Sequence, residues 1–212
     1  MGELHKAQRV GVFVDVQNLY YSAKFTHSAL PNFRPILDDV VRGRTLVRAI
    51  AYVIRAEEVN REEFFNVLSN MGFEIRAKDV QVFADGAKKG DWDIGIAMDA
   101  IELAPRLDTI IIVSGDGDFV PLVEHLRRAL GCRVEAAAYG KNTSQKLIEA
   151  VDLFTDLDKN PKYLRGHRPH EERHGEIDTH AVKAVTELRT EITSAPSQRP
   201  RQQMRRRRPQ RK

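Results

Sequence analysis

The chain has 212 residues, of which 42% are hydrophobic, and a formal net charge of +4. This length suits one well-buried domain rather than two. The single cysteine, Cys132, cannot form an internal disulfide or a cysteine-rich zinc site, so we expect a buried thiol and a reducing, cytoplasmic environment. The sequence contains neither a secretory signal pattern nor a run of about 18 apolar residues, and we therefore expect no membrane partner.

The net charge is unevenly distributed along the chain. Residues 161–212 contain 14 Lys and Arg against 6 Asp and Glu, a net +8, whereas residues 1–160 contain 20 against 24, a net −4. The hydrophobic pattern lapses after Pro161, apart from a short helical pattern between His180 and Leu188. Such a segment buries too little apolar surface to offset the entropy lost on ordering. We predict a domain over residues 1–160 and a basic, largely disordered tail over residues 161–212.

Strand and helix patterns alternate within the predicted domain. A β-branched and aromatic strand over residues 9–16 ends at the polar pair Gln17 and Asn18. The patterns that follow predict helices near residues 36–41, 61–71, 91–103, 119–130 and 143–150, and strands near 46–54, 73–82, 109–113, 134–138 and 153–154. This alternation predicts an α/β fold with a central, mostly parallel sheet flanked by helices on both faces.

Aspartates follow two of the predicted strands. Asp15 ends the first strand, Asp116 and Asp118 follow the strand at 109–113, and Asp93 and Asp99 lie on the helix before it. In parallel α/β sheets the ligand crevice lies outside the carboxyl ends of the strands, so these carboxylates would meet there if the two strands are neighbours. Clustered carboxylates need a counter-charge, and a cluster without His or Cys suits Mg²⁺ or Mn²⁺. This pattern favours metal-assisted attack of water on a phosphodiester.

Each of these aspartates also has a structural interpretation. Asp116 and Asp118 could cap the helix that follows them, and Asp15 could form a turn with Asn18. Asp99 lies six residues after Asp93, which places it about 120° away around a helix, so it is either the edge of the site or solvated surface.

Aromatic and basic residues suggest contacts with nucleic acid. Trp92, Tyr20 and Tyr21 could stack nucleobases, although burial in the core is the stronger interpretation. Lys88 and Lys89 lie in a glycine-flanked loop, where they either contact phosphate or are simply solvated. Five arginines in the tail could contact RNA phosphates: Arg201, Arg205, Arg206, Arg207 and Arg208. The alternative is that the tail is simply solvated or acts as a localisation signal.

Four blocks of residues resemble the NYN domains of the LabA/DUF88-like group, relatives of the PIN-domain nucleases. The blocks are Val12–Leu19, Lys89–Asp99, Ser114–Phe119 and Ser144–Phe154, and the resemblance covers residues 9–158. It implies a three-layer, Rossmann-like PIN/NYN fold. It also implies a divalent metal, Mg²⁺ or Mn²⁺, held by Asp15, Asp93, Asp116 and Asp118, with Asn18, Ser114 and Asp99 in supporting roles. Because Asp91 lies close to Asp93 in the sequence, either residue could match the first aspartate of the family's helix. The six-residue spacing to Asp99 favours Asp93.

The resemblance implies a metal-dependent endoribonuclease that hydrolyses phosphodiester bonds in single-stranded or structured RNA. The alternative is a catalytically weak RNA-binding or protein-interaction module on the same fold. No main carboxylate is replaced, which favours catalysis. A phosphatase-like hydrolase fits less well, because Asp15 is followed by Val16 and Gln17 instead of a second aspartate two positions on. The sequence does not determine the choice between RNA and DNA, or whether the chain forms a homo-oligomer.

Overall fold

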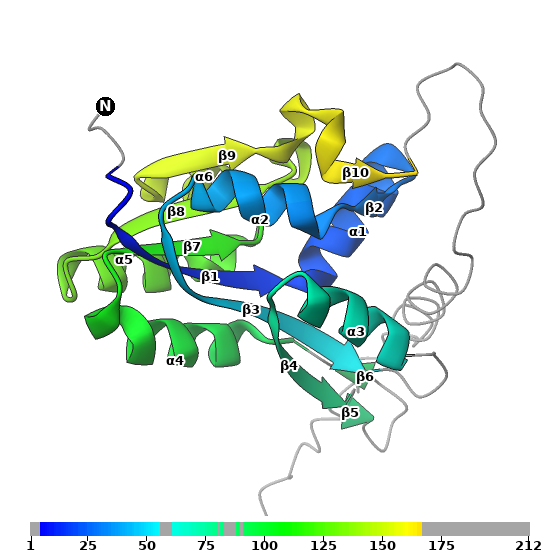
Figure 1. Cartoon of the computed structure of the whole chain (residues 1–212), viewed down its shortest axis with the longest axis horizontal. Helices are drawn as coiled ribbons and strands as arrows, with labels where there is room; N and C mark the ends of the chain where they lie inside the picture. The colour runs from blue at the N-terminus through cyan, green and yellow to red at the C-terminus, as the bar shows by residue number, and fades with distance from the viewer. Residues whose placement is uncertain (1–4, 56–60, 80, 83–87, 90, 167–212) are drawn as a thin grey trace, which may run out of the picture.

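Six parallel strands form the central sheet, as the alternation of strands and helices predicts (Figure 1). The computed structural model describes residues 5–55, 61–79, 81–82, 88–89 and 91–166. From one edge to the other, the sheet contains β4 (Glu74–Asp79), β3 (Thr45–Arg55), β1 (Arg9–Asp15), β7 (Thr109–Val113), β8 (Arg133–Ala138) and β9 (Leu153–Asp156). Every neighbouring pair is parallel. Because β1 lies beside β7, the two strands followed by the candidate aspartates end next to each other.

Hydrophobic layers cover both faces of the sheet. One face packs against α1 (Val16–His27), α2 (Phe33–Val41) and α3 (Arg61–Asn70), and the other against α4 (Asp93–Leu103), α5 (Val120–Arg128) and α6 (Gln145–Ala150). Within β1, Val12 and Val14 face the first layer whereas Phe13 faces the second. A strand buried on both faces has a continuous apolar sequence, which explains why β1 and β7 were predictable. The fold is a three-layer α/β domain, and Figure 1 shows α2 and α4 on opposite sides of β1.

The largest departure from the sequence prediction is α1, which follows β1 directly. We predicted no helix there, because the polar residues Gln17 and Asn18 interrupt the apolar pattern. The carboxylate of Asp15 accepts a hydrogen bond from the backbone N–H of Asn18 at 3.0 Å and caps this helix. Leu19 and Ala23 are fully buried on its inner side. The polar pair therefore belongs to the first turn of a helix and not to the end of a strand.

Other elements differ from the prediction mainly at their ends. The strand predicted at 73–82 is divided, because β4 joins the main sheet whereas β5 (Gln81–Val82) pairs antiparallel with β6 (Lys88–Lys89). A 3-10 turn over Gly117–Phe119 precedes α5. None of the helices within the described residues is long and apolar enough to cross a membrane.

The chain continues to pack against the domain beyond residue 160. There β10 (Leu164–Arg165) pairs antiparallel with β2 (Leu30–Pro31), and the ammonium of Lys162 lies 2.6 Å from the carboxylate of Asp39. Tyr163 is buried and donates a hydrogen bond to the same carboxylate. Packed structure therefore continues to Gly166. Beyond Gly166, the disorder predicted for the tail and the helical pattern near residues 180–188 fall on residues outside those the structure describes.

A buried ion pair joins α2 to the sheet. The guanidinium of Arg44 donates to both carboxylate oxygens of Glu135 on β8, at 3.0 and 2.8 Å. It also donates to the carbonyl oxygens of Val40 and Val41 at the end of α2, at 2.7 and 3.0 Å. The side chains of Arg44 and Glu135 are 0% and 4% exposed. If either residue is removed, the charge of the other therefore stays buried away from water.

We predict that Glu135→Ala destabilises the domain by about 3–5 kcal/mol, because it leaves the Arg44 guanidinium buried without a counter-charge. The double variant Arg44→Met/Glu135→Leu should recover much of that loss, since it removes both charges. The exposed pair Arg34 and Asp38 provides a control, and Asp38→Ala should cost less than about 1 kcal/mol. Urea unfolding followed by circular dichroism measures all three. Equal effects of Glu135→Ala and Asp38→Ala would contradict the prediction.

Candidate metal site

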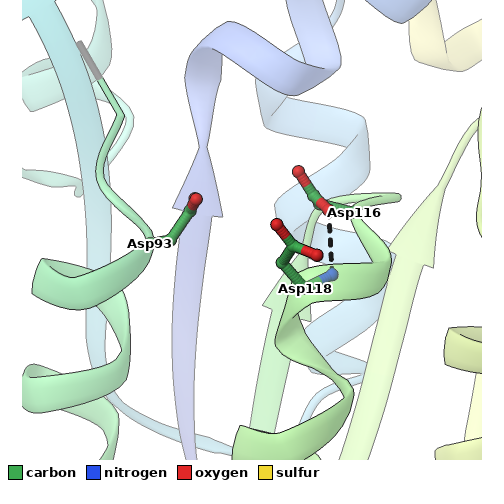
Figure 2. Close-up of side chains that lie close together, drawn as sticks. All are labelled: Asp93, Asp116 and Asp118. Carbon is green, nitrogen blue, oxygen red and sulfur yellow. Dashed lines mark hydrogen bonds between the residues drawn. The ribbon is translucent and has the colours of Figure 1, made fainter. Parts of the chain in front are cut away.

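Three aspartates from two segments gather at the carboxyl ends of β1 and β7 (Figure 2). Asp93 begins α4, whereas Asp116 and Asp118 belong to the turn that follows β7. Each offers a carboxylate oxygen within 4.8 Å of the other two. Figure 2 shows the three side chains reaching the space at the end of β1 from opposite sides of that strand. Of the two aspartates that flank Trp92, Asp93 and not Asp91 belongs to the group.

The turn that carries Asp116 and Asp118 is held by its own hydrogen bonds. The Asp116 carboxylate accepts a hydrogen bond from the backbone N–H of Asp118 at 2.9 Å. The backbone N–H of Asp116 in turn donates to the hydroxyl of Ser114 at 3.3 Å, and Ser114 is fully buried. Asp116 therefore caps the 3-10 turn and also belongs to the acidic group, so its structural and functional interpretations are compatible.

Two glycines let this turn lie directly against the residues that precede α6. A Cβ atom on Gly115 would lie 3.2 Å from the Cα of Thr143, and one on Gly117 would lie 2.7 Å from the hydroxyl oxygen of Ser144. The backbone N–H of Ser144 donates to the carbonyl of Gly115 at 2.9 Å. Thr143 and Ser144 thus support the carboxylate-bearing turn. Ser144 opened one of the blocks that carried the family resemblance, whereas no feature of the sequence indicated Thr143.

Asp15 lies beside this group but is not one of its three members. Burial raises the pKa of Asp15 to about 6, and the negative charges of Asp93 and Asp116 contribute to the shift. Asn18, in the first turn of α1, accepts a hydrogen bond from the backbone N–H of Gly115 at 3.0 Å. This contact connects the helix capped by Asp15 to the turn that carries Asp116.

The electrostatics of the group suit an oxygen-binding cation. Burial raises the pKa of Asp93, and Asp91, Asp116 and Asp118 raise it further, whereas Lys78 acts in the opposite direction. Both Asp15 and Asp93 are therefore harder to ionise than an isolated aspartate, because the ionised forms lose water and repel one another. A cluster that offers only carboxylate oxygens fits Mg²⁺ or Mn²⁺ and lacks the nitrogen and sulfur ligands typical of zinc sites.

Asp99 makes contacts away from the three-aspartate group. Its carboxylate accepts a hydrogen bond from the hydroxyl of Tyr52 on β3 at 2.8 Å and lies 3.5 Å from the guanidinium of Arg76 on β4. Asp99 therefore joins α4 to two strands at the edge of the sheet. The 120° rotation between Asp93 and Asp99 on a straight helix accounts for this separation.

Two of the three aromatic residues considered for base stacking are packed inside the domain. The indole N–H of Trp92 donates to the carbonyl of Val53 at 2.9 Å, and its ring lies 5.3 Å from that of Tyr52. A Cβ atom on Gly95 would come within 2.5 Å of the Trp92 ring. Tyr20 is only 6% exposed. Trp92 consequently fixes the start of α4, where Asp93 lies.

The basic residues predicted to bind RNA fall outside what the structure shows. The backbone of Lys88 and Lys89 forms β6, but the positions of their side chains are not described. The five tail arginines, Arg201 and Arg205–Arg208, lie outside the described residues. Cys132 is buried, as predicted, and burial raises the pKa of its thiol.

The parallel sheet and the acidic group at the carboxyl ends of its strands fit the PIN-like nuclease fold that an NYN domain implies. The chain belongs to the NYN domain family, whose model matches residues 9–158. It is similar to the low amplitude and bright protein LabA of Synechococcus elongatus, with 25% identity over 166 residues that cover 72% of this chain and 85% of LabA. These matches place it in the LabA-like group of NYN domain proteins.

A solved structure supports the same family assignment. The crystal structure of a protein of unknown function from Vibrio parahaemolyticus matches this fold with a TM-score of 0.70 and 33% identity. The match covers 77% of this chain and all of that one. The family resemblance predicted from the four sequence blocks is therefore confirmed.

The raised pKa of Asp15 predicts how stability depends on pH. The folded protein binds this proton with a pKa of about 6, whereas an aspartate in the unfolded chain titrates near 3.9. Ionised Asp15 therefore destabilises the fold at pH 7, and this cost disappears as pH falls from above 6 to about 4. Asn is also a good helix cap, so Asp15→Asn should stabilise the protein at pH 7 by about 1–3 kcal/mol in a chelator.

Urea unfolding at several pH values, with EDTA present throughout, measures this effect. The advantage of Asp15→Asn should shrink as pH falls and vanish near pH 4. An advantage that is the same at pH 4 and pH 7 would show that it does not come from the charge of Asp15.

Proposed function

We propose that this protein is a metal-dependent endoribonuclease that hydrolyses phosphodiester bonds in RNA. The observation that carries the proposal is the group of three carboxylates within 4.8 Å of one another at the carboxyl edge of a parallel sheet. Membership of the NYN family, which is related to nucleases, supports hydrolysis of a nucleic acid. RNA is the proposed substrate class, and a single buried cysteine suits a protein that works in the cytoplasm.

In this proposal Asp93, Asp116 and Asp118 hold Mg²⁺ or Mn²⁺, and Asp15 is the fourth carboxylate of the site. The cation, when bound, supplies Lewis acidity and lowers the pKa of water. The protein's own residues hold these carboxylates in position. Asn18 holds the start of α1 against the Asp116 turn.

Residues beneath the site keep the carboxylates in place. Ser114 supports the backbone of Asp116, and the packed ring of Trp92 fixes the helix end that carries Asp93. Asp99 contributes indirectly, by joining α4 to β3 and β4. A rigid arrangement of this kind preserves the spacing of carboxylates that repel one another without metal.

We predict that Asp116→Asn and Asp93→Asn each lower cleavage of labelled single-stranded RNA by at least about 100-fold, because each removes a charge that holds the cation. Asp38→Asn, at an exposed aspartate of α2, should leave cleavage unchanged. EDTA should abolish cleavage by the unaltered protein, and Mg²⁺ or Mn²⁺ should restore it.

Metal binding can be measured apart from cleavage. Mn²⁺ should raise the melting temperature of the unaltered protein and have much less effect on Asp116→Asn. Full cleavage by both site variants would overturn the assignment of the cleavage site to these aspartates. Tight RNA binding by the unaltered protein without metal-dependent cleavage would instead support the alternative, a catalytically weak RNA-binding module.

We further propose that the basic tail supplies RNA affinity without taking part in the chemistry. The core is net acidic and residues 161–212 are net +8, so the tail can offer the phosphate contacts that an acidic domain lacks. The proposed contacts come from Lys88 and Lys89 in the domain, and from Arg201 and Arg205–Arg208 in the tail. Because residues 161–166 pack on the domain, the tail is best removed after Gly166.

Truncation after Gly166 should reduce the slope of log K for RNA binding against log salt concentration by roughly 3–5. Each phosphate neutralised on a single strand contributes about 0.7 to that slope. A full-length variant with Gln at Arg201 and Arg205–Arg208 should show much of the same decrease, which separates charge from length. Cleavage at saturating RNA should survive in both proteins. An unchanged salt dependence in the truncated protein would rule out the tail as an RNA-binding arm.

A further inference from the structure

Four basic side chains lie on β3 and on its neighbour β4, the last strand at one edge of the sheet. Three of them have carboxylate partners: Arg48 pairs with Glu74, Arg55 with Asp79 and Arg76 with Asp99. The fourth, Lys78, forms no ion pair with any carboxylate of the described residues. Lys78 is therefore a cation of this edge whose charge is not paired within the part of the chain that the structure describes.

The ammonium of Lys78 is held in place by two uncharged groups. It donates a hydrogen bond to the backbone carbonyl of Asp91 and lies 4.7 Å from the centroid of the Trp92 ring. The side chain is half-buried. A carbonyl and an aromatic face fix the position of an ammonium but do not cancel its charge, and an ammonium has three N–H donors. Lys78 can therefore keep both contacts and still donate to an oxygen of a ligand.

Lys78 lies at the edge of the sheet that carries the acidic group. Neighbouring strands are all parallel, so their carboxyl ends share one edge, and Lys78 is the last residue but one of β4. The two residues that it contacts, Asp91 and Trp92, directly precede Asp93. Its charge acts on Asp93, where it opposes the rise of the carboxyl pKa. A fixed ammonium and the three carboxylates thus face the same end of the sheet.

The charge of the acidic group explains what such an ammonium can do for a substrate. Three ionised carboxylates carry one more negative charge than a divalent cation balances, and ionised Asp15 adds another. A phosphate that approaches the cation therefore meets net repulsion. Lysine binds phosphate as a point charge, so the Lys78 ammonium offsets this repulsion for a phosphate that lies against the end of β4.

We propose that Lys78 binds a backbone phosphate of RNA beside the acidic group, so that the strand crosses the end of β4 before it reaches the carboxylates. This inference rests on the proposed ribonuclease function and assigns a substrate-binding residue at the site itself. Lys78 differs from the tail arginines, because its contacts with Asp91 and Trp92 fix the place of the phosphate that it binds. The contact depends on charge and not on bases, and it adds no sequence preference.

Equilibrium binding tests the contact in a full-length Asp116→Asn parent kept in EDTA, where the probe is not cleaved and no divalent cation competes for phosphate. The probe is a labelled oligoadenylate of about eight nucleotides. Lys78→Met keeps the apolar stem and removes the charge, so it should weaken binding about tenfold and reduce the slope of log K against log salt concentration by about 0.7. Lys78→Arg should retain most of both. Lys159→Met, at an 81% exposed lysine that follows the opposite edge strand β9, should change neither.

Chemical labelling tests the same contact without substitution of Lys78. An amine-reactive ester acylates accessible lysines, and mass spectrometry measures the rate at each one. Saturating oligoadenylate should slow the acylation of Lys78 several-fold, because a bound phosphate stabilises the charged ammonium against the reactive free amine. The rate at Lys159 should stay unchanged in the same sample.

A purely structural role for Lys78 predicts different results. If Lys78→Met lowers the melting temperature and weakens binding while the salt slope stays that of the parent, Lys78 only fixes the segment before Asp93, and the phosphate contact is overturned. Unchanged RNA binding by Lys78→Met, or unchanged acylation of Lys78 when RNA is bound, also overturns it.

The outcomes distinguish this inference from the proposed function. If the unaltered protein cleaves RNA with Mg²⁺ or Mn²⁺ and Lys78→Met binds RNA as tightly as the parent, the Lys78 contact is overturned and the nuclease proposal stands. If RNA is not cleaved but Lys78→Met lowers both the affinity and the salt slope, the phosphate contact stands in a protein that only binds RNA. If the parent does not bind RNA and the unaltered protein does not cleave it, both are overturned.

Discussion

Negative charge gathered at the carboxyl ends of β1 and β7 opposes the ionisation of Asp15 and Asp93. Asp93, Asp116 and Asp118 offer oxygens within 4.8 Å of one another, and burial together with neighbouring charge raises the pKa of Asp15 to about 6. Separating the carboxylates would relieve this repulsion, so the surrounding structure must hold them in place. Much of the architecture around the site can be understood as a rigid support that maintains an unfavourable grouping of charge.

Several independent contacts provide that support. Buried parallel strands set the positions of β1 and β7, and the Asn18 amide fixes the start of α1 against the following turn. Gly115 and Gly117 leave no room for a Cβ atom, which allows the turn to lie against Thr143 and Ser144. Asp15 and Asp116 also accept backbone hydrogen bonds, so each contributes to the fold as well as to the acidic group. A structural role for an aspartate is therefore no argument against a functional one.

The family assignment and the geometry lead to the same proposal by different routes. The NYN match concerns the whole domain, whereas the carboxylate group concerns only a few side chains. The RNA contacts proposed to supply affinity lie elsewhere, at Lys88 and Lys89 and in the basic tail. This separation suits an acidic site, because carboxylates repel phosphate unless a cation lies between them. Affinity supplied by lysines and arginines would let the acidic group act on a backbone that it cannot itself attract.

The sequence by itself determined the fold class and identified the aspartates that are candidates for the site. Strands buried on both faces and helices with an apolar side have distinct local patterns, and the four sequence blocks indicated the family. Helix α1 was missed because its first turn is polar, and the turn considered between Asp15 and Asn18 is the cap of that helix. The local pattern indicated the turn at Asp15 but not the helix that continues from it.

Only the tertiary structure decided which aspartates meet. Asp93 and Asp99 lie on the same helix, yet one joins Asp116 and Asp118 whereas the other binds Tyr52 and Arg76. It likewise buried Tyr20 and packed Trp92, and left Phe25 exposed beside Tyr21. The physical reason is that hydrophobic periodicity encodes which side of an element is buried, whereas contacts between distant residues depend on strand order and on how each helix is turned against the sheet.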